Sequence, residues 1–362
     1  MDITKSFLAG EDLIVRRGGV TVLDIPSFAV DEGTVFSLIG PNGTGKSSLL
    51  LALAGLLAIH RGRICFNGRD IVRTGLVAYR RRISFVFQEP LLLDTTVFGN
   101  VSAGLKIRKK TGPEIEGRVH EVLEQFGILH LSERSARKLS GGEAQRTNLA
   151  RAFAVKPEII FLDEPFASLD SPTREGLIED LLKILRQTGT TALMATHDQM
   201  EALRLADRMA IMNGGRIVQT GTPAEIINHP CNAFVASFVG TETILEGQVM
   251  ENKIGNLTVS VNNHLIQAVA GTETAGRVLC CIRPEHVTIA LDKTTAVTSA
   301  RNVFPAVILD IRAMGPFFKV ILDCGFPLTA YVTRESLDNL TLCTGMSVTA
   351  SFKATAIHII QR

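Results

Sequence analysis

The chain has 362 residues, 46% of them hydrophobic and 20% charged, which is enough for two or three domains with sizeable cores. The formal net charge of +2 is too small to indicate a nucleic-acid partner, and we expect none. Six cysteines lie scattered without a Cys-x-x-Cys pair, which favours reduced thiols acting as small hydrophobic residues. The longest apolar run, 49–59, is too short to cross a bilayer, which takes about 20 residues. We therefore expect a cytoplasmic protein whose membrane role, if it has one, comes through partners.

Short apolar strands alternate with amphipathic helices up to about residue 240. Three stretches are predicted as buried strands: 35–39, 159–162 and 192–195. The segment 47–57 is predicted as the helix that follows the first of them, and this alternation favours an α/β domain with a mostly parallel sheet. Segment 114–126 has helical periodicity inside a region without a strand pattern, which predicts a helical insert at about 89–138.

The pattern changes after about residue 240. Apolar and polar residues alternate at 257–261 and 348–352, and Gly and Asn turns separate such runs. We therefore expect residues 1–240 to form the α/β domain and residues 241–362 to form an all-β domain. The stretches 278–289 and 348–359 resemble each other at a constant offset of 70, which suggests an internal duplication. Shared strand periodicity alone would also produce such a match.

A glycine-rich segment follows the first predicted strand and fits the pattern G-x-x-x-x-G-K-[ST]. Its glycines let backbone N–H groups approach phosphate oxygens, and the N-terminus of the next helix adds partial positive charge. Lys46 is expected to reach the β- and γ-phosphates, and the Ser47 hydroxyl to bind Mg²⁺. The predicted phosphate site consists of Gly40, Pro41, Asn42, Gly43, Thr44, Gly45, Lys46, Ser47 and Ser48.

Two carboxylates, Asp163 and Glu164, end the strand predicted at 159–162. Beside a phosphate site, the first can hold Mg²⁺ and the second can polarise the attacking water. Elsewhere, the ordinary explanation of such a pair is a solvated strand end. Gln88 and His197 also lie where predicted strands become loops, a position at which a single Gln or His is more often structural than catalytic.

A second anion site is predicted where another helix begins, after Leu139. It consists of the hydroxyl and main-chain amides of Ser140, Gly141, Gly142 and Glu143. Because the chain has two such sites but one glycine-rich phosphate loop, the two sites suggest a dimer in which they meet.

In order and spacing, these residues resemble the ABC ATPase family over about residues 12–240. Besides the phosphate loop (P-loop), the matching elements are the Q-loop Gln88, the signature 139–143, Asp163-Glu164, the D-loop ending at Asp170, and the switch His197. The resemblance implies a homodimer in which Ser140 to Gly142 of one subunit cover the ATP on the other subunit's P-loop. It also implies that Gln88 senses the γ-phosphate and joins Ser47 and Asp163 at Mg²⁺, with Glu164 as general base and His197 at the γ-phosphate.

The same resemblance implies partners at the membrane. The helical insert would contact two transmembrane permease subunits, and an extracytoplasmic substrate-binding protein would act through that permease. The ATPase would then lie peripherally on the cytoplasmic face of the membrane.

Two residues depart from the family pattern. Glu143 stands where the signature usually has Gln, and Arg17 stands where many members stack an aromatic ring on adenine. A guanidinium plane can also stack on a base, so Arg17 is included in the predicted ATP site.

The C-terminal region resembles the TOBE accessory domain of importer ATPases, an OB-like all-β domain. Within it, the run Ser299, Ala300, Arg301 and Asn302 is similar to the start of a molybdate-binding module. Ser336 and Lys353 fall in further matching segments, and O–H, N–H and cationic donors of this kind suit a tetrahedral oxyanion. The alternative is that these Ser and Lys residues merely decorate a small barrel.

The combined features indicate the ATPase of an importer for molybdate or tungstate, with ATP and Mg²⁺ as cofactors and a possible oxyanion site in the C-terminal domain. One alternative keeps the ATPase but has sulfate, a polyamine, a sugar or ferric ion as cargo, with a purely structural C-terminal domain. Another makes the C-terminal domain an oxyanion store or sensor. A soluble ABC protein of DNA repair or translation is disfavoured, because the chain has one P-loop and no heptad run.

Overall fold

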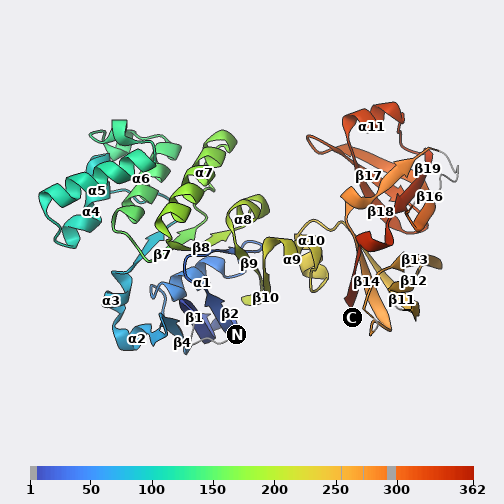
Figure 1. Ribbon diagram of the computed structural model, residues 1–362, viewed down its shortest axis with the longest axis horizontal. Coiled ribbons are helices and arrows are strands. Elements are labelled where there is room, and N and C mark those ends of the chain that lie inside the picture. The colour runs from blue at the N-terminus through green and yellow to red at the C-terminus, as the bar shows by residue number, and fades with distance from the viewer. Residues whose placement is uncertain (1–5, 254, 272, 292–298) are drawn as a thin grey trace. The chain divides into compact units, whose positions relative to one another are not determined.

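The computed structural model describes residues 6–253, 255–271, 273–291 and 299–362. The chain divides into two compact units, Met1–Pro223 and Ala224–Arg362 (Figure 1). This division falls before the predicted boundary at residue 240. The reason is that helix α10 (Ala233–Phe238) packs within the second unit, where its Ala236 is buried against Leu279 and Cys281.

The first unit is built on a six-stranded sheet of order β10-β9-β3-β8-β7-β6. These strands are β3 (Val35–Ile39), β6 (Ile83–Val86), β7 (Ile159–Asp163), β8 (Thr191–Thr196), β9 (Arg208–Asn213) and β10 (Arg216–Gly221). The first five run parallel, and β10 pairs antiparallel with β9. The three strands predicted from the sequence are confirmed, as is the predominantly parallel sheet.

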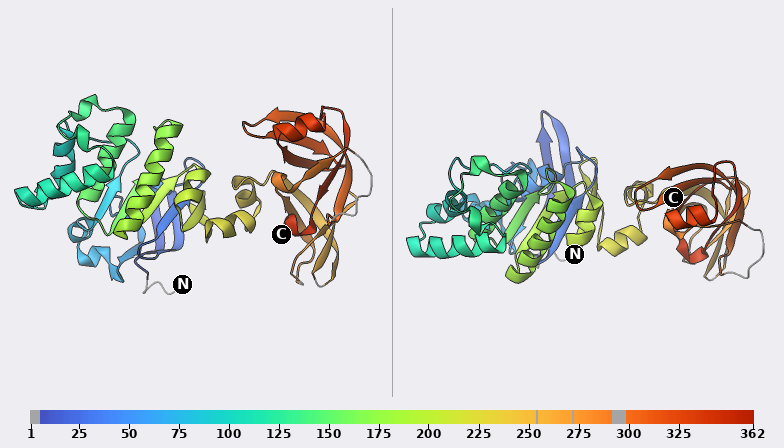
Figure 2. Two further views of the ribbon diagram at one scale, coloured as in Figure 1. Left: turned by 45° about the horizontal axis from the view of Figure 1, so that its top comes forward. Right: turned by 90° about the horizontal axis from the view of Figure 1, so that it is seen from above.

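The side chains of β7 point alternately into two hydrophobic cores of the first unit. Ile160 and Leu162 belong to the core shared with the helices on one face, whereas Ile159 and Phe161 belong to the core on the other face. The first core is covered by α4 (Val97–Ile107), α5 (Gly112–Gln125), α6 (Gly141–Ala154) and α7 (Ser171–Thr188), as Figure 2 shows. The second is covered by α1 (Lys46–Leu53) and a smaller sheet. Burial on both faces is typical of parallel strands and explains their continuous apolar sequences.

That smaller sheet was not predicted. It is antiparallel, of order β2-β1-β4-β5, and it is formed by β1 (Leu8–Arg17), β2 (Val20–Val30), β4 (Arg61–Phe66) and β5 (Arg69–Asp70). Two short helices follow it, α2 (Ile71–Thr74) and α3 (Leu76–Arg80), and α8 (Gln199–Leu205) lies between β8 and β9. The expected insert at 89–138 contains α4, α5 and the 3-10 turns η2 (Leu129–Leu131) and η3 (Ala136–Lys138), so its helical character is confirmed.

The second unit begins with α9 (Pro223–Asn228) and α10 and continues as an all-β domain, as predicted. Its first run of strands is β11 (Thr243–Lys253), β12 (Asn256–Val261), β13 (His264–Ala268), β14 (Arg277–Ile282) and β15 (Thr288–Ala290). Its second run is β16 (Asn302–Ala313), β17 (Phe318–Asp323), β18 (Pro327–Val332), β19 (Ser347–Phe352) and β20 (Ile357–Gln361). Helix α11 (Arg334–Asn339) precedes β19, and the 3-10 turns η4 (Pro284–His286) and η5 (Ala354–Ala356) follow β14 and β19.

The two runs of strands form equivalent sheets that exchange their last strands. The sheets have the orders β13-β12-β11-β14-β20 and β18-β17-β16-β19-β15. Strand β20 of the second run therefore pairs with β14, and β15 of the first run pairs with β19. A 3-10 turn also links the last two strands in both runs, so the two runs share strand order and connection, which is the arrangement that the suggested duplication would produce.

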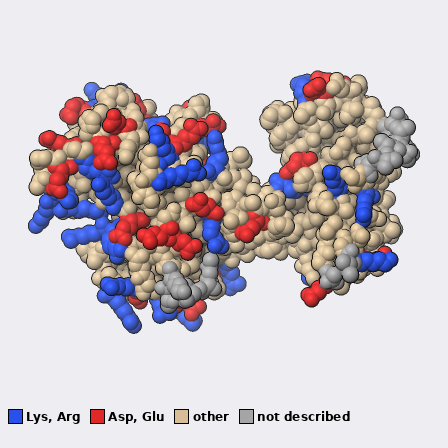
Figure 3. All heavy atoms as spheres, viewed as in Figure 1, with Lys and Arg blue, Asp and Glu red and all other residues tan. Residues whose placement is uncertain are grey.

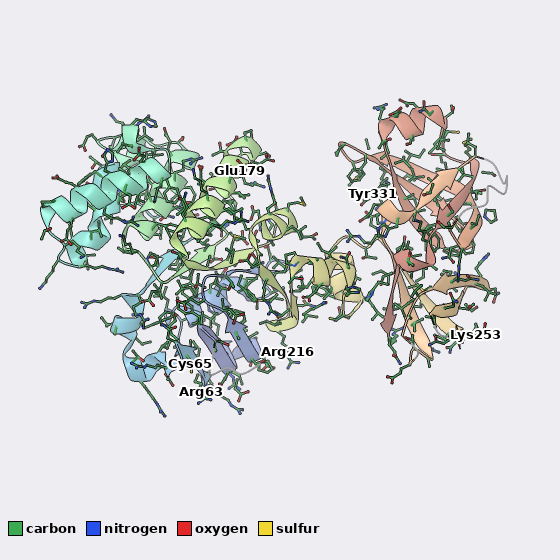
Figure 4. All side chains as sticks on the ribbon, viewed as in Figure 1. Arg63, Cys65, Glu179, Arg216, Lys253 and Tyr331 are labelled. Carbon is green, nitrogen blue, oxygen red and sulfur yellow. The ribbon has the colours of Figure 1, made fainter. Side chains whose placement is uncertain are left out.

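The surfaces of the two units differ in composition. On the face shown in Figure 3, charged side chains are dense over the first unit and sparse over the second. Tyr331 of β18, labelled in Figure 4, donates a hydrogen bond of 2.7 Å to the Glu242 carboxylate within the second unit. In the described part of the chain, no helix is both long and apolar enough to cross a membrane.

Candidate nucleotide site

The candidate site lies at the carboxyl ends of three neighbouring parallel strands. In the sheet β8 separates β3 from β7, and Thr196 at the end of β8 pairs with Ile39 at the end of β3. On the other side of β8, Asp163 pairs with Ala195. The P-loop, the Asp163-Glu164 pair and the loop after β8 therefore emerge at one edge, which is where open α/β sheets bind ligands.

The P-loop backbone needs glycine at the start of α1. Gly45 has φ 99°, and a Cβ atom there would lie 2.7 Å from Leu23 Cδ2. Lys46 follows, and its Nζ donates to the main-chain oxygens of Gly40 at 2.7 Å and Pro41 at 3.0 Å. Burial lowers the pKa of Lys46, against the opposing influence of the Glu164 and Asp163 carboxylates. The ammonium is thus held by neutral carbonyls that anionic phosphate oxygens can replace.

Ser47 and Asp163 are joined directly. The Ser47 hydroxyl donates to Asp163 Oδ1 at 2.8 Å. Burial raises the pKa of Asp163, and the hydrogen bond from Ser47 opposes that rise. One hydroxyl and one carboxylate suit Mg²⁺, which commonly takes one or two protein oxygens and completes its shell with phosphate oxygens and water. The described residues contain no group of three His, Cys, Asp or Glu side chains able to hold a metal.

The predicted catalytic pair is in contact. Glu164 donates its main-chain N–H to Ala195 at 2.9 Å and adopts φ 45°, a left-handed conformation that non-glycine residues rarely take. Its Oε2 lies 3.2 Å from His197 Nδ1. Side-chain exposure is 15% for Glu164 and 51% for His197, so the carboxylate is sheltered while the imidazole faces solvent.

Gln88 is exposed just beyond β6, and the structure records no side-chain hydrogen bond for it within the described residues.

A polar network that the sequence analysis missed supports the His197 loop. The Thr196 hydroxyl donates to Glu201 Oε2 at 2.5 Å and accepts the Asp198 N–H at 3.0 Å. Arg174 of α7 donates to the Leu169 carbonyl at 3.0 Å and lies 3.5 Å from Asp198 Oδ2. Glu201 is 5% exposed, and burial raises its pKa. These contacts tie the loop after Asp163-Glu164 to the loop that carries His197.

The signature residues form the cap of α6. Ser140 donates its N–H to Glu143 Oε2 at 2.7 Å, and its hydroxyl accepts the Glu143 N–H at 3.3 Å, which is a capping box. The Ser140 N–H lowers the pKa of Glu143, and Arg134 lies 3.4 Å away as a further cation. Glu143, the departure from the family pattern, therefore has a structural role. Asp170 caps α7, and a hydrogen bond from Thr173 lowers the pKa of Asp170.

A cavity of about 490 Å³ opens over the P-loop. It is lined by Arg17, Val20, Thr21, Val22, Asn42, Gly43, Gly45, Lys46, Ser47, Ser48, Glu164, Gly214 and Gly215. Arg17 thus shares a cavity with the phosphate site, whereas the signature residues do not line it.

The sequence analysis did not predict that Gly214 and Gly215 would line this cavity, although Asn213 followed by two glycines is a turn signal. Gly215 must be glycine, because a Cβ atom there would lie 2.5 Å from the Val22 oxygen.

The structure separates the predicted oxyanion residues into different environments. Asn302 is buried and is not an available ligand, since its amide exchanges two 2.8 Å hydrogen bonds with the Gln267 main chain. Arg301 donates to Asn256, and Ser336 hydrogen-bonds Thr333 at 3.0 Å within the cap of α11. Ser299 and Lys353 are exposed, and Ala300 is half-buried. Asn302 pairs with Phe352, so Arg301 and Lys353 lie just beyond the adjacent ends of the neighbouring strands β16 and β19.

Fold and site together define an ATPase of the P-loop class, and comparisons with known proteins narrow that class. The ABC transporter family model matches residues 23–167, and the TOBE domain model matches residues 298–359. The molybdate/tungstate import ATP-binding protein of Pyrococcus horikoshii is 42% identical, over 92% of this chain and 94% of its own. The sulfate/thiosulfate import ATP-binding protein of Mycobacterium bovis is 39% identical, over 80% of this chain and 82% of its own.

A ferric-ion import ATP-binding protein of Streptomyces coelicolor is 43% identical but spans 67% of this chain and 70% of its own. The solved structure of cbiO1 from Clostridium perfringens, part of the ABC transporter complex cbiONQ, has a TM-score of 0.58. It is 31% identical and covers 61% of this chain and 90% of its own. The chain therefore belongs to the ABC transporter family, as one of its import ATP-binding proteins, and binds and hydrolyses ATP.

The first prediction concerns the network beneath the switch loop. Thr196→Val keeps the side-chain shape but removes both hydroxyl hydrogen bonds, so His197 is no longer held in place. We expect kcat for ATP hydrolysis to fall about tenfold while ATP affinity stays unchanged, because misplacing a reacting group costs rate rather than binding. Steady-state ATPase assays and nucleotide titration measure the two effects.

Thr188→Val is the matched control. Thr188 bonds the main chain of its own helix at 2.8 Å, near the end of α7. An equal loss of activity in both variants, or a loss of ATP affinity in Thr196→Val, would contradict the positioning role.

Proposed function

We propose that two copies of this chain form a head-to-tail homodimer that hydrolyses Mg·ATP at two composite sites. The support is geometric: Ser140 to Glu143 are ordered as a helix cap but do not line the P-loop cavity of their own chain. In the dimer, the signature of one subunit covers the nucleotide bound to the other. Ser47 and Asp163 hold Mg²⁺, which neutralises developing charge on the phosphates, and Gln88 completes the site once nucleotide is bound.

In this proposal, three side chains act directly on the nucleotide or on the attacking water: Lys46, Glu164 and His197. The Lys46 ammonium leaves the Gly40 and Pro41 carbonyls and pairs with the β- and γ-phosphates. The Glu164 carboxylate accepts a proton from the attacking water as that water approaches the γ-phosphorus. His197, already in contact with Glu164, donates a hydrogen bond to the γ-phosphate and orients the pair. Arg17 lies against the adenine, and Asp170 lines the partner-facing surface beside the signature.

We propose that the cargo is molybdate or tungstate. The observation that carries this choice is identity over nearly the whole chain: the Pyrococcus horikoshii relative is 42% identical over 92% of it, whereas a sulfate/thiosulfate relative that covers 93% is 37% identical and the ferric-ion relative covers 67%. A second molybdate/tungstate import protein, from Thermococcus kodakarensis, is 40% identical over 80% of this chain. Sulfate is the nearest alternative, because the mycobacterial relative covers as much of the chain as the Thermococcus one.

In this proposal, the ATPase lies peripherally on the cytoplasmic face of the membrane, against two transmembrane permease subunits. The helical insert formed by α4 and α5 is the contact region. A substrate-binding protein on the outer side delivers the oxyanion to the permease. The C-terminal unit offers Ser299, Arg301, Ser336 and Lys353 to the oxyanion, with residues from two copies completing one site.

The second prediction tests the general base. Glu164→Gln keeps the size of the side chain but cannot accept a proton, so we expect ATP binding to persist while hydrolysis falls about 10²–10⁴-fold. Bound ATP then holds the protein as a dimer, which size-exclusion chromatography detects. Glu179→Gln, on the exposed face of α7 (Figure 4), is the matched control and is expected to remain fully active. Near wild-type hydrolysis by Glu164→Gln would remove this residue from the base role.

The third prediction tests the composite sites with a mixed dimer. One chain carries Ser140→Arg and the other carries Lys46→Ala, so both defects fall on one composite site and the second site stays intact. We expect ATP-driven dimerisation in the mixture and none in either variant alone. If the mixture dimerises no better than the separate variants, the signature does not act on the partner's nucleotide.

The fourth prediction concerns the cargo. In a transporter reconstituted with its permease and binding protein, we expect external molybdate or tungstate to stimulate ATPase activity and sulfate not to stimulate it. Stimulation by sulfate alone would select the alternative cargo.

Calorimetry on the purified chain checks the C-terminal site separately. Lys353→Ala is expected to weaken oxyanion binding about tenfold or more, because hydrogen bonds to charged groups contribute about 1.5–3 kcal/mol.

A further inference from the structure

A cavity of about 600 Å³ lies wholly within residues of the C-terminal unit. Three parts of the unit surround it. They are the end of α9 with the segment after it, the segment after β13, and the ends of β14 and β20 with the 3-10 turns η4 and η5 beside them. Its lining consists of Ile227, Asn228, His229, Pro230, Thr241, Val269, Ala270, Gly271, Thr274, Cys281, Arg283, His286, Thr355, Ala356, Ile357, His358 and Ile359. None of these residues belongs to the nucleotide site or to the oxyanion residues considered above.

The charge of the lining favours an anion. The described residues that form it include one guanidinium and three imidazoles, but neither Asp nor Glu. Glu285 lies outside the lining and forms an ion pair with Arg283, with its Oε1 2.6 Å from Arg283 Nε. Arg283 is therefore the one guanidinium among the described lining residues, and its ion pair engages Nε and leaves the terminal nitrogens as further donors.

The imidazole of His358 is fixed in one neutral form. Its Nε2 lies 2.9 Å from the Pro230 carbonyl, which can only accept, so Nε2 carries the proton and Nδ1 is the acceptor. Burial lowers the pKa of His358, which keeps the ring neutral, and the His229 ring packs edge-on at 5.5 Å between centroids. Cys281 pairs with His358 across β14 and β20, and burial raises the pKa of its thiol to about 12. This wall is therefore uncharged and polarisable.

A buried hydroxyl lies near the cationic group. Thr241 is 4% exposed and lines the cavity, and its side chain carries a hydroxyl that can donate one hydrogen bond. Since Thr243 pairs with Ile282, Thr241 and Arg283 lie just beyond the ends of adjacent strands β11 and β14. An anionic oxygen placed between these two residues could accept hydrogen bonds from both the guanidinium and the hydroxyl.

The rest of the wall is apolar. Ile227, Val269, Ala270, Ile357 and Ile359 contribute hydrocarbon surface to the same cavity. An inorganic oxyanion would leave this surface and most of the volume to water, whereas ligand pockets of about 300–1,000 Å³ usually hold organic molecules. We propose that the cavity binds a small organic anion, a carboxylate or a phosphate ester, with its charged head at Arg283 and Thr241 and its apolar part against the isoleucine side chains. This site is distinct from the proposed ATP and oxyanion sites.

Phenyl phosphate is a suitable probe, because it combines an anionic head with an apolar ring. Binding is measured by calorimetry on the full chain with Mg·ADP saturating the P-loop. We expect one site per chain, with at least tenfold weaker binding to inorganic phosphate and to benzyl alcohol, which each lack one half of the recognition. Phenylacetate is tested as the carboxylate counterpart. Whichever of phenyl phosphate and phenylacetate binds with higher affinity identifies the head group that the site prefers.

Arg283→Gln is expected to weaken phenyl phosphate binding at least tenfold, and Thr241→Val several-fold without changing the side-chain shape. Arg312→Gln is the matched control, since Arg312 is an exposed guanidinium on β16 that pairs with Asp310. Arg283→Lys retains a charge and is expected to recover part of the affinity, which separates lost recognition from lost folding. The proposal is overturned if phenyl phosphate does not bind, if inorganic phosphate binds equally well, or if Arg312→Gln weakens binding as much as Arg283→Gln.

Discussion

The chemistry of this protein depends on one constraint, the burial of β3, β7 and β8 on both faces of the central sheet. Because alternate residues of each strand enter different cores, these strands cannot slip or turn over without exposing one core to water. Only their carboxyl ends are left for polar groups. Lys46, Asp163, Glu164 and His197 come from distant parts of the sequence and meet there because the strands are adjacent and parallel.

In the nucleotide site each reactive group already has a partner that a substrate can replace. Lys46 is held by two main-chain carbonyls, Ser47 by Asp163, and Glu164 by His197. The groups are thereby oriented before ATP arrives, so less reorganisation accompanies binding. The signature, in contrast, is satisfied internally by its own capping box. Lys46, Ser47 and Glu164 thus line one cavity of the chain, whereas the signature residues do not.

Sequence reasoning predicted local structure correctly where the signal lies in contiguous residues. A phosphate loop or a helix cap works through neighbouring main-chain N–H groups, so Gly40–Ser47 and Ser140–Glu143 carry their own signal. It failed where partners are distant: the Thr196–Glu201–Arg174 network, Gly215 beneath Val22, and the antiparallel sheet formed by β1, β2 and β4. Asn302 illustrates the same limit, because its side chain suits a ligand but tertiary structure places it against Gln267.

The exchange of β15 and β20 between the two C-terminal repeats has a consequence for how this unit is made. On the ribosome, β11 to β14 emerge early, yet the edge of β14 stays unpaired until residues 357–361 have been synthesised. Exposed strand edges invite pairing with other chains, and contacts between distant segments form slowly. The repeats therefore cannot mature one after the other, and a nascent chain carries an open edge through most of the synthesis of this unit.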